Sequence, residues 1–197
     1  INIPSVDPPD YRTWIPAKSS LPEQHSDSPI YATCPQTLPN GTLGRSLFVS
    51  PSDYLGIDFS SYERAVDVGG VYVFEGPTSH DIVSEALDET RYELTGSYKS
   101  YDLYDREDIP RTVAATDGVV LWAQGETRRQ SLETIVDTGE GRIPRRHETD
   151  DEFAMLTDAM GATDFDTIDG LDLGLEATTE ARLTGTSHTY QGGTAYI

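Results

Sequence analysis

The pattern of apolar and polar positions changes character at about residue 46. Beyond it, short apolar runs separated by glycine turns indicate β-hairpins, and apolar residues three and four apart indicate helices. Gly69-Gly70 and Asp117-Gly118 are the two clearest turns. The predicted elements are a short strand at 46–50, a hairpin at 62–68 and 71–75, a helix at about 79–90, strands at 92–99 and 101–104, a hairpin at 111–116 and 119–122, a helix carrying Leu132, Ile135 and Val136, and a helix at about 150–160.

The two hairpins are each followed by a helix, at a constant offset of 49 residues. This offset aligns Gly76 with Gly125 and Val83 with Leu132. We therefore predict an α+β domain over residues 47–174, with an antiparallel sheet and helices on one face. Its arrangement is either ferredoxin-like (split βαβ) or a duplication of strand-strand-helix units, and chance convergence of a common motif remains the alternative to duplication.

Residues 1–46 contain eight of the 12 prolines, a spacing that disfavours helices and central strands. We predict an extended arm docked on the body, because Trp14 and Ile15 in a free linker would leave large apolar area in water. Tyr11 and Tyr31 are further expected anchors.

Residues 175–197 predict a terminal β-hairpin, with apolar residues two apart at Ala181 and Leu183 and again at Ala195 and Ile197. Because the chain stops on an apolar strand, we expect it to continue into a further module. Its start has neither an initiator Met nor the layout of a signal peptide, so we expect a mature, trimmed or partial chain.

The charge of the chain indicates the salt environment in which the protein works. The 197 residues include 20 Asp and 14 Glu against 12 Arg and only two Lys, which gives a net charge of -20 and a pI near 4.3. Such a chain repels itself in dilute buffer, and molar salt screens this repulsion by shortening the Debye length to about 3 Å. We predict a halophilic protein; the alternative is an ordinary acidic one.

The same charge argues against nucleic acid as a partner, because nucleic-acid binding depends on Lys and Arg neutralising phosphates. An anionic membrane surface is disfavoured for the same reason. No run of apolar residues is long enough for a transmembrane segment. The single cysteine, Cys34, excludes an internal disulfide, and we expect it to be a buried or idle thiol.

Two motifs are candidate sites. Asn40-Gly41-Thr42 matches the N-glycosylation pattern and lies where a turn is expected, so Asn40 is a candidate glycan acceptor. Residues 164–172 concentrate carboxylates around a glycine, although not in the register of an EF-hand loop, and a solvated acidic loop is the alternative to a calcium site. The candidate calcium ligands are Asp164, Asp166, Asp169 and Asp172.

No catalytic residues are predicted. The four histidines, His25, His80, His147 and His188, are far apart and share no metal-ligand spacing. No nucleophile elbow or phosphate-binding loop occurs, and no cofactor is expected. One basic cluster, Arg142, Arg145, Arg146 and His147, is either a docking patch for an acidic partner or a sugar acid, or a linker between helices that balances nearby carboxylates.

Residues 6–17, VDPPDYRTWIPA, resemble the start of a family of uncharacterised haloarchaeal secreted, lipoprotein-like proteins. In these, a Pro-rich "DY..W.P" segment precedes α+β modules, and residues 70–75 and 101–104 match the expected strands. The resemblance implies an extracytoplasmic, cell-surface or secreted location and no active site. The export signal and lipid-attachment cysteine of that family are missing from this sequence.

Together these features predict a non-enzymatic, halophilic surface or secreted protein that acts by binding or assembly. The expected partner is another protein or a second copy, joined by strand pairing at a sheet edge. The alternative is a solute- or ion-binding domain of an envelope complex, with the 164–172 segment or a tyrosine-lined sheet face as its site.

Overall fold

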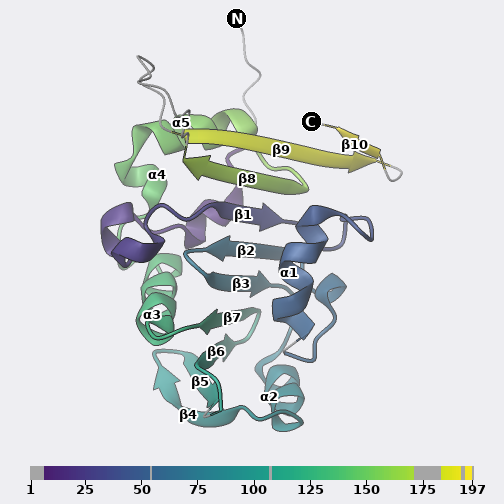
Figure 1. The fold of residues 1–197 in the computed structure, drawn as a ribbon, viewed down its shortest axis with the longest axis vertical. Helices are drawn as coiled ribbons and strands as arrows, with labels where there is room; N and C mark the ends of the chain where they lie inside the picture. The colour runs from purple at the N-terminus through teal and green to yellow at the C-terminus, as the bar shows by residue number, and fades with distance from the viewer. Residues whose placement is uncertain (1–6, 54, 107, 171–182, 192–193, 197) are drawn as a thin grey trace, which may run out of the picture.

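A computed structural model describes residues 7–53, 55–106, 108–170, 183–191 and 194–196. In this part of the chain ten strands form one sheet in the order β10-β9-β8-β1-β2-β3-β7-β6-β5-β4, and neighbouring strands pair antiparallel. Figure 1 shows them stacked along the long axis of the molecule, with β9 and β10 at one end and β4 at the other. The strands are β1 (Ile30–Thr33), β2 (Arg64–Val68), β3 (Val71–Glu75), β4 (Glu93–Tyr98), β5 (Tyr101–Arg106), β6 (Arg111–Thr116), β7 (Val119–Gln124), β8 (Phe165–Gly170), β9 (Leu183–Gln191) and β10 (Thr194–Tyr196).

Five α-helices accompany the sheet in the described residues, and short 3₁₀ helices occur before β1 and after α1. They are α1 (Leu43–Asp53), α2 (His80–Asp88), α3 (Arg128–Gly139), α4 (Arg146–Thr149) and α5 (Asp151–Met160). The hairpins β2–β3, β4–β5 and β6–β7 and the helices α2, α3 and α5 confirm the sequence predictions for these segments. The α+β class is confirmed with them.

Helices cover both faces of the sheet, so the prediction of helices on one face is wrong. Successive residues of β3 belong to two different apolar cores. Val73 lies in one core with Leu132 of α3, whereas Phe74 lies in the other with Val83 of α2 and Phe48 of α1. Side chains along a strand point alternately to the two faces. The central strands are apolar at successive positions because both of their faces are buried. Since α2 and α3 lie on opposite faces, the two hairpin–helix units do not pack in the same way.

The Pro-rich segment supplies a strand to the interior of the sheet, which corrects the expectation that it forms no central strand. β1 lies between β2 and β8, and no proline interrupts it because Pro29 and Pro35 fall outside its ends. Tyr11, Trp14 and Ile15 are buried in the core that contains α3. The segment is therefore part of the domain rather than a layer on its surface.

The apolar run at 46–50 is helical, and the predicted strand there is wrong. Thr42 begins the helix α1: its hydroxyl accepts a hydrogen bond from the Arg45 amide (3.4 Å), and its carbonyl accepts one from the Ser46 amide (3.1 Å). This satisfies amides of the first turn that would otherwise lack partners. The expected domain boundary after residue 46 thus falls inside a helix.

The tail forms the predicted hairpin, β9 with β10, and β9 also pairs with β8 along the main sheet. In the described residues the tail therefore belongs to the same sheet as β1–β8. Residues 175–182, including Ala181, and Ile197 lie outside the described residues. None of the helices described is both long and apolar enough to cross a membrane.

Candidate functional sites

An arginine-lined cleft opens where β4, β5 and the start of α3 meet. Its volume is about 640 Å³, and it is lined by Glu93, Thr95, Asp105, Arg106, Asp108, Ile109, Pro110 and Arg128. Five of the 12 arginines of this acidic chain, Arg91, Arg106, Arg111, Arg128 and Arg129, belong to this cleft and the contacts around it.

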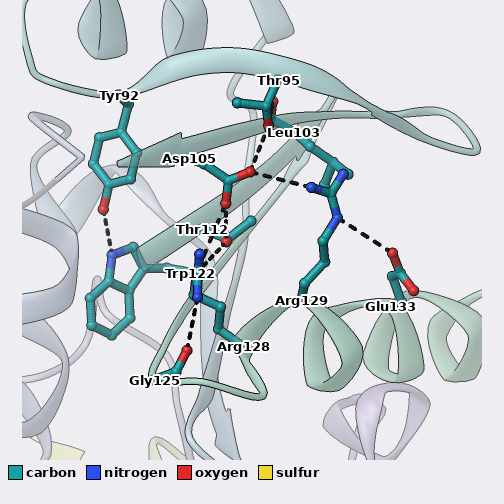
Figure 2. Close-up of polar contacts among 10 residues, drawn as sticks. All are labelled: Tyr92, Thr95, Leu103, Asp105, Thr112, Trp122, Gly125, Arg128, Arg129 and Glu133. Carbon is teal, nitrogen blue, oxygen red and sulfur yellow. Dashed lines mark hydrogen bonds and ion pairs between the residues drawn. The ribbon is translucent and has the colours of Figure 1, made fainter. Parts of the chain in front are cut away.

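Asp105 of β5 organises one wall of the cleft (Figure 2). Its carboxylate accepts hydrogen bonds from the hydroxyl groups of Thr95 (2.6 Å) and Thr112, and it forms an ion pair with Arg129 (3.3 Å). The Thr112 hydroxyl in turn accepts a hydrogen bond from Nε of Arg128 (3.0 Å). Strand pairing makes this arrangement possible, because β5 and β6 place Asp105 directly opposite Thr112.

Asp108, which also lines the cleft, binds two arginines. Arg106 binds both of its carboxylate oxygens, at 2.8 and 2.7 Å, and Arg91 binds one of them at 3.0 Å. Hydrogen bonds from Arg106, with those from Arg91, hold the pKa of the Asp108 carboxyl far below its ordinary value. Near these contacts, the Trp122 indole of β7 donates a hydrogen bond to the Tyr92 hydroxyl (2.9 Å), as Figure 2 shows.

Two lining groups remain available to a ligand. Arg128 donates from Nε to Thr112 and from Nη1 to the Gly125 carbonyl (3.2 Å), and its Nε also lies 3.9 Å from the Asp105 carboxylate. Its Nη2 group has no partner among the described residues. The exposed Glu93 carboxylate likewise has none there. The cleft can therefore offer one positive and one negative group to a bound molecule.

The second candidate is the outer edge of β9. β8 pairs with Leu183–His188 on one side of β9, whereas β10 covers only Thr189–Gln191 on the other. The outer edge of residues 183–188 therefore has no strand partner in the described part of the chain. Its nine residues, Leu-Thr-Gly-Thr-Ser-His-Thr-Tyr-Gln, include no Asp, Glu, Lys or Arg.

Asn40 lies exposed in the turn after Pro39, next to Gly41, whose φ of +80° suits glycine. The predicted acidic loop at 164–172 is instead largely strand β8. Asp166 is 2% exposed and accepts hydrogen bonds from Thr163 and Ser187 (both 2.7 Å), and burial raises its pKa.

The other candidate calcium ligands do not join Asp166. Asp164 accepts a hydrogen bond from the Tyr190 amide (2.7 Å), and Asp169 accepts one from the Gly170 amide (2.7 Å). Asp172 lies outside the described residues. Among the residues that are described, no three His, Cys, Asp or Glu side chains form a group that could hold a metal ion.

The basic cluster at 142–147 is occupied by local contacts. Arg146 is buried, stacks over Phe153 (4.6 Å to the ring centroid) and pairs with Asp150 at 3.2 Å. Arg145 donates to the Thr138 and Gly139 carbonyls, and exposed Arg142 pairs with Glu140. Cys34 is half-buried, and burial raises the pKa of its thiol.

The histidines stay apart, and each has its own surroundings. His80 Nε2 lies 2.9 Å from Asp102, His188 lies against Phe165, and burial lowers the pKa of His147. The tyrosines of the predicted sheet face do not line one open surface, because Tyr101 and Tyr104 of β5 are buried in the two different cores. Tyr72 of β3 also lies against Phe48 and Trp122. The sequence pattern does not predict the arginine cleft, because its lining residues come from three separate segments, 93–95, 105–110 and Arg128.

No family model and no curated protein matches this chain. Among solved structures, two crystal forms of TP0453 share its α+β fold. Form IV matches with a TM-score of 0.50 at 11% identity over 84% of this chain and 65% of that one. Form I matches with a TM-score of 0.50 at 9% identity over 85% and 64%. This chain thus spans about 65% of the length of TP0453, and at such identity the likeness concerns the fold alone.

Proposed function

We propose that this protein is a non-enzymatic, salt-adapted surface protein that acts by assembly, pairing the outer edge of β9 with the same edge of a second copy. The observation that carries the proposal is the open edge of residues 183–188 in β9, a strand without Asp, Glu, Lys or Arg, in a chain of net charge -20. Main-chain groups of an open edge bind an added strand with the hydrogen bonds of a regular sheet.

The geometry of β9 supports such pairing. Hydrogen-bonding groups alternate between the two sides of an antiparallel strand. The His188 carbonyl accepts a bond from Asp164 on the β8 side, so the main-chain groups of Gly185 and Ser187 point to the open side. The Leu183 amide is bound by the Glu152 carboxylate (3.0 Å), which marks the end of the open stretch.

The other end of the sheet is less suited to strand addition. β4 carries the charged Glu93 and a register shift between Leu94 and Gly96. Bulges and charges on edge strands are common protections against edge-to-edge association. β9 has neither feature over its paired length.

Two-fold closure favours a second copy as the occupant, and charge restricts where that copy can bind. Two copies with net charge -20 repel each other, and they approach most readily where each surface carries no charge. Molar salt weakens the remaining repulsion from nearby carboxylates such as Glu152. Two β9 edges paired about a two-fold axis form a closed dimer, because each copy then has no further free β9 edge to bind a third copy.

An extracytoplasmic location forms part of the proposal. It is supported by the exposed acceptor Asn40 in its turn and by the resemblance of residues 6–17 to secreted proteins. A different protein as the strand donor is the alternative occupant, and the experiment below separates the two.

The test compares two variants that each add one negative charge at an exposed position of an edge strand. Thr186→Glu places the charge at the middle of the open β9 edge, and Ser97→Glu places it on β4. Sedimentation in molar KCl over a range of micromolar concentrations measures the size of each species.

We expect the wild type and Ser97→Glu to form dimers that weaken as the salt is diluted. Thr186→Glu should remain monomeric in the same buffer, because like charges directly opposite each other oppose strand pairing. A monomeric wild type would refute self-assembly. Equal dimerisation of both variants would place the contact elsewhere than β9.

A further inference from the structure

The arginine cleft has a charge pattern that assembly through β9 does not use. Asp105 and Asp108 are each surrounded by arginine or threonine donors, so their charges are neutralised within the protein. The Nη2 group of Arg128 and the carboxylate of Glu93 remain without partners in the described residues. Ile109 and Pro110 add apolar surface to the same cleft.

The contacts of Arg128 hold its guanidinium in place before any ligand binds. Nε is bound to Thr112, whose hydroxyl is itself fixed by Asp105, and Nη1 is bound to the Gly125 carbonyl. The side chain nevertheless keeps 26% of its surface exposed. A pre-positioned planar guanidinium loses little freedom when it binds a carboxylate.

We propose that this cleft binds a small zwitterion, an aliphatic α-amino acid, with its carboxylate on Arg128, its ammonium group on Glu93 and its side chain against Ile109 and Pro110. This assignment follows from charge complementarity. Arg128 pairs with Asp105 only through Nε, at 3.9 Å, and its Nη2 group, like the exposed Glu93 carboxylate, has no partner in the described residues; both lie beside an apolar surface. A cleft of about 640 Å³ has ample room for such a molecule.

The position of Glu93 favours a zwitterion over a simple anion. In molar KCl the net charge of -20 is screened beyond about 3 Å, so the preference is set by the charges inside the cleft. Glu93 would lie close to any anion bound at Arg128. A ligand with an ammonium group can instead form an ion pair with the Glu93 carboxylate.

The experiment titrates L-valine into the full chain in molar KCl and follows amide chemical shifts. Isobutylamine and isobutyrate, which each keep only one of the two charges, serve as comparison probes. We expect L-valine to bind with a Kd of about millimolar order, as its small size allows, and to shift amides of Glu93, Thr95 and Arg128. Each single-charge probe should bind at least about tenfold more weakly.

Variants assign the two charged contacts. Glu93→Gln and Arg128→Gln should each weaken L-valine binding by about tenfold or more, while Arg142→Gln, which removes an exposed arginine paired with Glu140, should leave it unchanged. Arg128→Gln also removes the contact to Thr112, so its unfolding transition is measured alongside. Glu93 is exposed and has no such contact, which keeps the test independent of folding.

The possible results separate the explanations. Binding of isobutyrate as strong as that of L-valine would show a plain anion site and overturn the proposal. Absence of valine-induced shifts, or equal weakening by Arg142→Gln, would overturn it as well. Since the readout concerns only β4, β5 and α3, failure of dimerisation through β9 leaves this result unaffected.

Discussion

Asp67 gives the sharpest prediction of pH-dependent stability. It lies on β2 in register with Tyr31 of β1 and Tyr72 of β3, half-buried among aromatic rings. Burial raises the pKa of its carboxyl from an ordinary value of 3.8 to about 7, and hydrogen bonds from Tyr72 and the Gly70 amide offset only part of that effect. The perturbation is Asp67→Asn, which keeps the shape and removes the charge.

The sign follows from proton binding. Between pH 4 and 7 the folded state holds a proton on Asp67 that the unfolded state has released, so the free energy of unfolding falls as the pH rises through this window. A shift of about three units corresponds to at most about 4 kcal/mol. Asp67→Asn should therefore match the wild type near pH 4 and exceed it by about 2 to 4 kcal/mol at pH 8.

Denaturant unfolding at constant molar KCl, repeated from pH 4 to pH 8, measures both proteins. The difference between them isolates Asp67, because all other carboxyl groups are common to both. Asp88→Asn, which removes a charge from an exposed position on α2, reports the effect of net charge alone. A wild-type-to-Asp67→Asn difference that stays constant with pH, or that shrinks as the pH rises, would refute the reasoning.

Four further predictions test packing, environment and modification. Gly139→Ala should destabilise the fold by about 1 to 3 kcal/mol and alter Trp fluorescence, because the added Cβ would overlap the Trp14 ring. Gly170→Ala, whose Cβ would meet nothing within 4 Å, should do neither. Trp122→Phe should cost about 1 to 3 kcal/mol in urea unfolding, because it leaves the buried Tyr92 hydroxyl without its donor. The unfolding midpoint should rise steeply from low to molar KCl, and an unchanged midpoint would contradict salt adaptation. Protein from its native source should carry extra mass that Asn40→Gln abolishes.

The hairpins could be predicted because their signals are local. Gly69-Gly70 and Asp117-Gly118 form the turns between strands, and both Gly70 and Gly118 adopt the positive φ that these turns require. The two-sided burial of β3 and β7 was also within reach, since their apolar residues run consecutively. A run of successive apolar residues predicts helices on both faces of the sheet, because a strand with one exposed face alternates apolar and polar residues.

Other features depend on distant partners. β1 becomes a central strand because β2 and β8 supply its hydrogen bonds, and the four residues Ile30–Thr33 carry no local sign of those partners. The cleft depends on β5–β6 pairing and on α3, which bring Arg129 to Asp105 from 24 positions away. The helix at 46–50 was missed because its capping residue, Thr42, precedes the apolar run that suggested a strand.

The two proposed sites lie at opposite ends of one sheet, and this separation has a consequence for how they would work together. β9 is next to one end of the strand order, and β4 and β5 form the other end, as Figure 1 shows. A dimer joined at β9 would therefore carry its two arginine clefts at its far ends, both open. Neither site contributes a residue to the other, so the cleft has no reason to bind its ligand more tightly in the dimer than in the monomer. The affinity for L-valine should consequently be the same in wild-type dimers and in Thr186→Glu monomers.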